Sequence, residues 1–181
     1  MMRGVLFVTV LAAGVLATSV SGSHQAKPAA AADPVIVFET AKGTIEMALF
    51  QAEAPKSVAH ILDLMKRSFY RGQRFHRVLG SLIQVGDPNS RNMSRQDSWG
   101  TSNSGRPIGV FEWSKKRLHV RGAVALAHSG DPARADSQIY IMKTASPSLD
   151  GKHAVIGRVI AGMAVVDKIA VADMIKDAKI K

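Results

Sequence analysis

The stretch YRGQRFHRVLGSLIQVGDP, Tyr70–Pro88, contains two short runs of strand-forming residues separated by one small break. Arg74–Leu79 is expected to form a strand, Gly80-Ser81 a short link, and Leu82–Gly86 a second strand. Successive side chains of a strand point to opposite faces of its sheet. The pattern therefore predicts which side chains of this stretch lie together.

This alternation brings one basic and one amide side chain beside apolar groups. Phe75 and Arg77 share one face of the first strand, and Leu82 and Gln84 share one face of the second. If these faces coincide, a guanidinium and an amide lie against apolar walls, which is the general form of a small-ligand site. The alternative is a basic strand edge on which Arg77 faces solvent.

The composition indicates one folded domain without disulfides. The chain has 181 residues, of which 46% are hydrophobic and 21% charged, and it has no cysteine. This excludes thiolate zinc sites and a thiol nucleophile. The net charge of +10 permits binding to nucleic acid, but the basic residues are scattered and aromatic residues make up only 6%. Nucleic acid is therefore not expected as a partner.

The amino terminus has the pattern of a targeting segment. A positive charge at Arg3 precedes the apolar stretch Gly4–Val20, and two clusters of small residues follow it. We expect residues 1–32 to be a signal peptide and flexible leader, and residues 33–181 to be the folded domain. The protein would then be exported to the periplasm, with no stable membrane insertion after cleavage. The alternative is an uncleaved membrane anchor, because the apolar stretch is only slightly shorter than a spanning helix.

Hydrophobic periodicity predicts many strands and two helices. Helical spacing of apolar residues is present in Pro55–Ser68 and Met163–Val171, and Asn89–Gly109 is expected to be one long loop. Besides the two strands above, strands are expected at Val35–Phe38, Thr44–Phe50, Val110–Trp113, Arg121–Ala127, Ser137–Lys143, Ala154–Ile160 and the tail Ile175–Lys181. Many short antiparallel strands with few helices favour a mainly β fold, a closed barrel with helices at its ends.

Several kinds of catalytic site have little support in the sequence. The histidines lack the spacing of metal ligands, and there is no Gly-x-Ser-x-Gly motif and no phosphate-binding glycine loop. We therefore expect no metal and no cofactor. Rotation about an X-Pro peptide bond needs only a donor, an amide and apolar walls. Twisting the amide returns the lone pair to the prolyl nitrogen, so a guanidinium N–H directed at that nitrogen lowers the barrier.

Four segments resemble the cyclophilin family of peptidyl-prolyl isomerases, in the same order and at nearly the same spacing. They are FHRV at Phe75–Val78, IQVGDP at Ile83–Pro88, SQIYI at Ser137–Ile141 and LDGKHAVIGRVIAGMAVVDKI at Leu149–Ile169. The resemblance extends from about Val35 to the carboxyl terminus. It implies a closed eight-stranded antiparallel β-barrel capped by two α-helices, and catalysis of X-Pro rotation during protein folding. The expected partners are proline-containing unfolded or partly folded polypeptides, and a monomer is expected.

The resemblance assigns roles residue by residue. Arg77 corresponds to the family's catalytic arginine, and Gln84 to the glutamine that binds substrate and orients that arginine. His76 would point away from Arg77 on a strand, which gives it a supporting role. The positions that resemble substrate-binding residues are Phe75, His76, Leu82, Ala127, His128, Gln138, Tyr140, Leu149 and His153.

The sequence departs from the family pattern around the expected pocket. The link Gly80-Ser81 is one residue shorter than usual and lacks an aromatic residue, Tyr140 replaces a phenylalanine, and His128 stands where many members have asparagine. Ser148 occupies a position that often has an aromatic residue contributing to cyclosporin binding, so weak cyclosporin affinity is expected. The alternative function is a cyclophilin-like peptide-binding or chaperone module with little or no isomerase activity.

Overall fold

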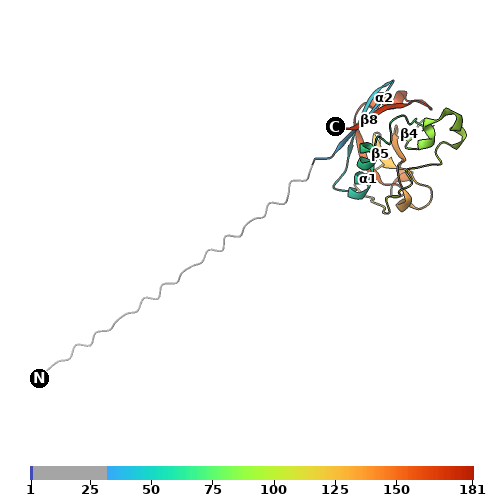
Figure 1. The fold of residues 1–181 in the computed structure, drawn as a ribbon. Coiled ribbons are helices and arrows are strands. Elements are labelled where there is room, and N and C mark those ends of the chain that lie inside the picture. Colours follow the sequence, from blue (N-terminus) through green and yellow to red (C-terminus); the bar gives the residue numbers. More distant parts are fainter. Residues whose placement is uncertain (2–31) are drawn as a thin grey trace.

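The computed structural model describes residue 1 and residues 32–181 (Figure 1). The predicted signal peptide and leader therefore lie almost wholly outside the described residues. Among the helices that are described, none has both the length and the apolar character needed to cross a membrane.

Eight strands form one antiparallel sheet, and each overlaps a strand predicted from the sequence. Their order across the sheet is β3-β4-β6-β5-β7-β2-β1-β8. The strands are β1 Val35–Thr40, β2 Gly43–Leu49, β3 Arg77–Val78, β4 Leu82–Val85, β5 Ala123–Leu126, β6 Ile139–Met142, β7 Val155–Ala161 and β8 Ile175–Ile180.

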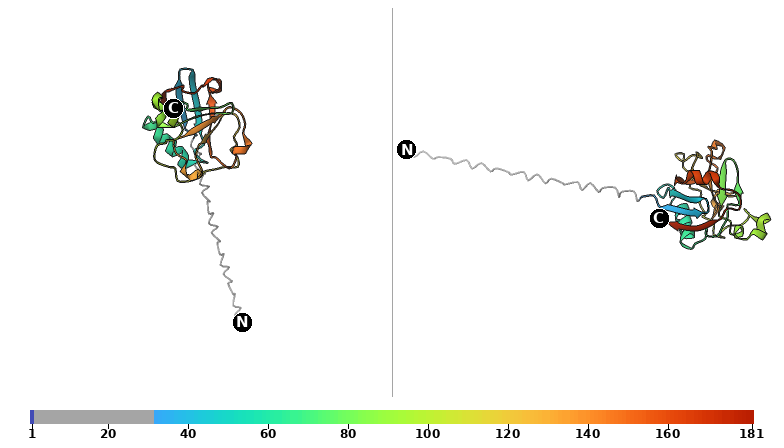
Figure 2. Two further views of the ribbon diagram at one scale, coloured as in Figure 1. Left: turned by 90° about the vertical axis from the view of Figure 1, so that its right-hand side faces the viewer. Right: turned by 90° about the horizontal axis from the view of Figure 1, so that it is seen from above.

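The sheet is a curled half-barrel, so the predicted closed barrel is wrong (Figure 2). Its edges are β3 and β8, and within the described residues a single bridge, between Arg74 and Met174, joins the segments next to them. A closed barrel needs a continuous ladder between these edges. The backbone of Phe75 instead bonds to Asp173 and Ala172, which precede β8. β3 itself has only two residues, and the ladder does not continue from it to β8.

Two α-helices, α1 at Pro55–Lys66 and α2 at Met163–Lys168, lie at separate ends of the curled sheet (Figures 1 and 2). α1 begins with a proline, whose missing N–H is not needed in the first helical turn. Both helices are shorter than the sequence predicts. α1 ends before Ser68, whose φ of 54° is left-handed, and α2 ends before Ile169, which is extended.

The sheet separates two apolar clusters. Leu82 and Ile83 are neighbours on β4 and therefore point to opposite faces. Ile83 belongs to the main core, which α1 covers and which includes Phe38, Ile61, Val124 and Ile156. Leu82 belongs to a smaller cluster with Phe50, Ala125, Tyr140, Met142 and Val155. The candidate site lies on the face of this smaller cluster.

Two connecting segments differ from expectation. Val110–Trp113 is not a strand. The carboxylate of Glu112 in its middle accepts hydrogen bonds from the backbone N–H groups of Lys56 and Ser57 at the start of α1 (3.1 and 2.8 Å). The segment therefore caps a helix and does not join the sheet. The predicted long loop after β4 contains two 3₁₀ turns, η1 Pro88–Arg91 and η2 Met93–Ser98. The side chain of the residue before each turn accepts a hydrogen bond from the backbone N–H of the second residue of the turn. This local effect is not revealed by periodicity.

Candidate active site

One row of residues crosses four strands on the face of the smaller cluster. Arg77 on β3 pairs with Gln84 on β4, Gln84 with Tyr140 on β6, and Tyr140 with Ala125 on β5. Directly paired residues of neighbouring strands share a face. Leu82 lies two residues before Gln84 and is on this face as well. The common face predicted for Arg77, Leu82 and Gln84 is therefore present.

A chain of side-chain hydrogen bonds holds Arg77 at the end of this row. Its Nη1 donates to Gln84 Oε1 (3.2 Å), and Gln84 Nε2 donates to Gln138 Oε1 (2.8 Å). Gln138 Nε2 donates in turn to the carbonyl oxygens of Ser102 (2.7 Å) and Gly100 (3.1 Å). Gln84 is buried and Arg77 is exposed. Gln84 thus orients the guanidinium, and the other N–H groups of Arg77 remain accessible to a ligand.

An apolar wall lies beside this chain. Tyr140 and Leu82 are buried in the smaller cluster, and Leu149 and Ala127 are partly buried against it. Leu149 comes from a third element, the 3₁₀ turn η4 Pro147–Leu149. A guanidinium, an amide and an apolar wall are therefore adjacent, which is the mixed character of a small-ligand site.

A polar groove of about 430 Å³ continues from this wall. It brings together four of the predicted site residues, which come from β4, from the segment after β5 and from the segment before β6. They are Gln84, Ala127, His128 and Gln138. The groove is also lined by Gly100, Thr101 and Asn103 of the long loop. An extended chain lying in this groove would therefore contact both backbone and side-chain polar groups.

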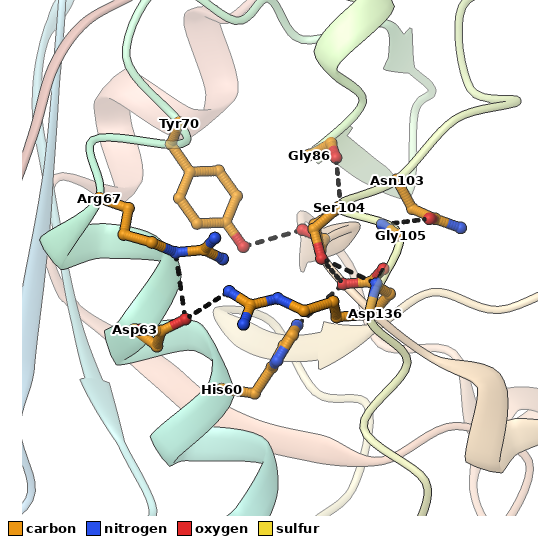
Figure 3. A network of polar contacts seen from close by, with 11 residues as sticks. His60, Asp63, Arg67, Tyr70, Gly86, Asn103, Ser104, Gly105 and Asp136 are labelled. Carbon is orange, nitrogen blue, oxygen red and sulfur yellow. Dashed lines mark hydrogen bonds and ion pairs between the residues drawn. The ribbon is translucent and has the colours of Figure 1, made fainter.

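Asp136 holds the loop that lines the groove (Figure 3). It accepts hydrogen bonds from Ser104 Oγ (2.5 Å) and the backbone N–H of Arg106 (3.0 Å), and it contacts His60 Nε2 on α1 (2.8 Å). Burial raises the pKa of Asp136, but these hydrogen bonds outweigh burial and lower the pKa below its ordinary value. Arg106 also reaches Asp63 on α1 (3.2 Å). The loop is therefore tied to the helix through a carboxylate that stays ionised.

Three of the predicted residues are histidines at the border of the site. The rings of His128 and His153 are 4.2 Å apart, and the ring of His153 stands edge-on to Tyr140 at 5.7 Å. Burial lowers the pKa of His153, and the nearby His128 lowers it further. Burial also lowers the pKa of His76. Within the described part of the chain, no group of three or more metal-ligating side chains could hold a metal ion.

Phe75 lies in the main core, so the predicted common face of Phe75 and Arg77 is wrong. It has no exposed surface and belongs to the same core cluster as Ile83. Because β3 begins only at Arg77, the alternation of a strand does not extend back to Phe75. A side chain with no exposed surface does not contact a peptide, so Phe75 contributes to the core.

The fold and the motifs agree with one family of known proteins. Residues 35–181 match the family model described as cyclophilin type peptidyl-prolyl cis-trans isomerase/CLD. The chain belongs to the cyclophilin family. Curated relatives of this cyclophilin are named as peptidyl-prolyl cis-trans isomerases, and the chain is therefore an isomerase of this type.

Two bacterial relatives and one solved structure illustrate the similarity. A probable peptidyl-prolyl cis-trans isomerase of Brucella suis is 39% identical over 147 residues, with 78% of this chain and 74% of that protein covered. The enzyme of Helicobacter pylori is 34% identical over 142 residues, with 77% and 82% covered. A cyclophilin type isomerase of Cryptosporidium parvum has a TM-score of 0.69 at 25% identity, with 82% of this chain and 98% of that chain covered.

Two residues near the cyclophilin site were not predicted from the sequence. Asp136 immediately precedes the SQIYI segment, and its place as a polar residue before a buried strand is the one sequence signal that could have found it. His119 is almost fully buried beside Tyr140. The sequence around His119, a lone histidine after a basic run, does not predict this contact. The contact forms only because distant segments of the chain pack together.

The free energy of unfolding of this cyclophilin is expected to fall as the pH is lowered from about 7.5 to about 5.5. Folding lowers the pKa of His76 and His153 below 6.5, so the unfolded chain binds more protons in this range and acid favours it. His153→Gln removes one of these groups and should make the decline less steep. Urea denaturation of both proteins at each pH measures the free energy of unfolding. The same dependence on pH in both proteins would contradict the prediction.

Proposed function

We propose that this cyclophilin accelerates rotation about X-Pro bonds in unfolded or partly folded polypeptides, with Arg77 as the catalytic donor. The observation that carries the proposal is the hydrogen-bond chain from Arg77 through Gln84 to Gln138, beside an apolar wall. A Cryptosporidium parvum cyclophilin of similar fold (TM-score 0.68, 24% identity) was solved in the presence of the dipeptide Ala-Pro. We accordingly take proline-containing peptides as the ligand class.

The proposed reaction needs a donor at the prolyl nitrogen and breaks no bond. Rotation about a peptide C–N bond has a barrier of about 18–20 kcal/mol, because the nitrogen lone pair is delocalised into the carbonyl. In the twisted amide the lone pair is localised on nitrogen. A guanidinium N–H directed at it binds the twisted amide better than the planar one, which lowers the barrier. Arg77 suits this role because a guanidinium is a rigid, planar donor and Gln84 holds one side of it.

The proposed substrate pose follows from the two parts of the site. The proline ring would pack on the wall of Leu82, Tyr140 and Leu149, since this is the apolar part next to Arg77. The residues before the proline would run toward the polar groove, where Ala127 and His128 present backbone groups and a ring. This arrangement leaves the prolyl nitrogen near the exposed guanidinium.

Gln84→Leu is expected to lower kcat/KM for a proline tetrapeptide roughly ten-fold, because it removes a hydrogen bond to a charged group. Without Gln84 Oε1 the guanidinium loses its orienting partner, and Gln138 loses its donor. A protease-coupled isomerisation assay measures the effect. The matched control is Gln96→Leu, an exposed glutamine in η2, which should leave the rate unchanged. Equal rates for Gln84→Leu and wild type would remove Gln84 from the mechanism.

The broader role in folding is tested with a protein whose refolding waits for an X-Pro bond, a step that takes about tens to hundreds of seconds. The wild type should accelerate this phase, and Arg77→Ala should not. Equal acceleration by both would contradict the role of Arg77. Binding of the unfolded chain without any acceleration would instead favour a peptide-binding or chaperone role.

We also propose export to the periplasm. The support is the order of charge, apolar stretch and small residues within residues 1–32 of the sequence. Sequencing the amino terminus of the protein from a periplasmic extract should find that this segment has been removed. Recovery of the intact segment in the membrane fraction would favour a membrane anchor.

A further inference from the structure

A buried polar chain lies behind the apolar wall of the site. Asp150 Oδ1 contacts His119 Nδ1 (2.8 Å), and His119 Nε2 contacts the hydroxyl of Tyr140 (2.8 Å). His119 is 1% exposed, and its ring is stacked on that of Tyr140 at 5.9 Å between centroids. Asp150 immediately follows Leu149, which belongs to the same wall. One end of this chain is therefore in the candidate proline pocket.

The direction of each hydrogen bond follows from the carboxylate. The backbone N–H and the ring of His119 lower the pKa of Asp150, so the carboxylate is ionised and only accepts. His119 Nδ1–H therefore donates to Asp150, and the tautomer that carries this one ring proton leaves Nε2 as an acceptor. Burial raises the pKa of Tyr140, so its hydroxyl keeps its proton and donates to Nε2.

The hydrogen bond to His119 determines which part of Tyr140 faces the apolar wall. Tyr140 lies among Leu82, Ala125 and Leu149, where a free hydroxyl would be unfavourable beside an apolar ligand. The bond to His119 occupies the hydroxyl proton and holds the phenol end away from the cluster. Stacking on His119 and the edge-on ring of His153 orient the aromatic plane. The ligand then meets only the ring of Tyr140.

We propose that His119, oriented by Asp150, is a positioning residue that holds Tyr140 so that only its ring faces the proline. This inference rests on the proposed placement of the proline against Tyr140. It assigns a role in substrate selection to a histidine that touches neither the substrate nor Arg77.

A double-mutant cycle in the isomerisation assay tests the inference, with His119→Leu, Tyr140→Phe and the double variant. His119→Leu is expected to lower kcat/KM roughly five-fold, mainly through a higher KM, because the released hydroxyl enters the apolar wall. In the Tyr140→Phe background the same substitution should cause no further loss. An equal loss in both backgrounds would overturn the inference, since a merely structural role does not depend on the hydroxyl. His119→Gln, which still offers an acceptor, should retain most of the activity lost in His119→Leu.

If His119→Leu does not fold, Asp150→Ala tests the same inference. Asp150→Ala leaves the histidine in place but removes the acceptor that sets its tautomer. It should raise KM, as His119→Leu does. This effect should also vanish in the Tyr140→Phe background, and its persistence there would overturn the inference. Arg77→Ala in the same assay separates the two proposals, because full activity of that variant refutes the proposed mechanism whatever the cycle shows.

Discussion

Arg77→Ala is expected to lower kcat/KM for a proline tetrapeptide roughly 100-fold, the usual cost of removing one donor aimed at transition-state charge. The guanidinium lies at the end of the row formed with Gln84 and Tyr140. In the proposed mechanism its donor is needed only when the amide is twisted, so the loss should appear in kcat and only weakly in peptide affinity. Isomerisation kinetics and a separate peptide titration measure the two quantities.

Two further substitutions complete this experiment. Arg77→Lys keeps the charge but loses the planar, paired N–H groups, so it should recover only part of the activity. Arg67→Ala is the matched control, because Arg67 is half exposed just after α1 and, among the described residues, its side chain pairs only with Asp63. Surface pairs of this kind contribute little to stability, so this variant should behave as wild type. Wild-type activity in Arg77→Ala would end the proposal that this arginine is the donor.

Gly86→Ala is expected to lower the free energy of unfolding by about 3 kcal/mol or more, through backbone strain and overpacking together. Gly86 has a φ of 116°, which L-residues rarely adopt, and an added Cβ would lie 2.1 Å from the carbonyl oxygen of Ser137. It would also lie 2.6 Å from the Cα of Gln138, so relief of the clash moves the residue that supports Gln84. Urea denaturation measures the stability, and the isomerisation assay should show a loss of activity in parallel.

Gly80→Ala is the matched control for this prediction. Gly80 lies in the link between β3 and β4, its φ is not positive, and an added Cβ would have no neighbour within 4 Å among the described residues. It should therefore change the free energy of unfolding by less than about 0.5 kcal/mol. Similar losses in the two variants would show that the close approach of Gly86 to Ser137 and Gln138 is not the cause.

Much of the secondary structure could be predicted because it depends on residues close in the chain. The apolar run of Leu82–Val85 and the alternation on Gly43–Leu49 indicate strands wherever those segments lie. The closed barrel could not be excluded in this way. Closure depends on whether β3 pairs with β8. Within the described residues β3 pairs with β4 and β8 pairs with β1, and these two edge strands do not pair with each other.

The site was predicted in part for the same reason. Arg77, Leu82 and Gln84 are near one another in sequence, and their common face follows from two short strands and a link. Phe75 was assigned to the wrong face because strand alternation was extended across residues that do not form a strand. Nothing local indicates that His119 meets Tyr140, since neither residue's neighbours reveal which strand lies opposite.

By itself, the sequence determined the eight strands, the two helices and the motifs that identify a cyclophilin, because each depends on residues that are consecutive in the chain. The tertiary structure alone decided which of these residues act together. Gln84 reaches Gln138 across 54 positions and His60 reaches Asp136 across 76. Such contacts exist only when sheet register and loop packing bring distant segments together. Hydrogen bonds then hold Arg77 to Gln84 and Tyr140 to His119.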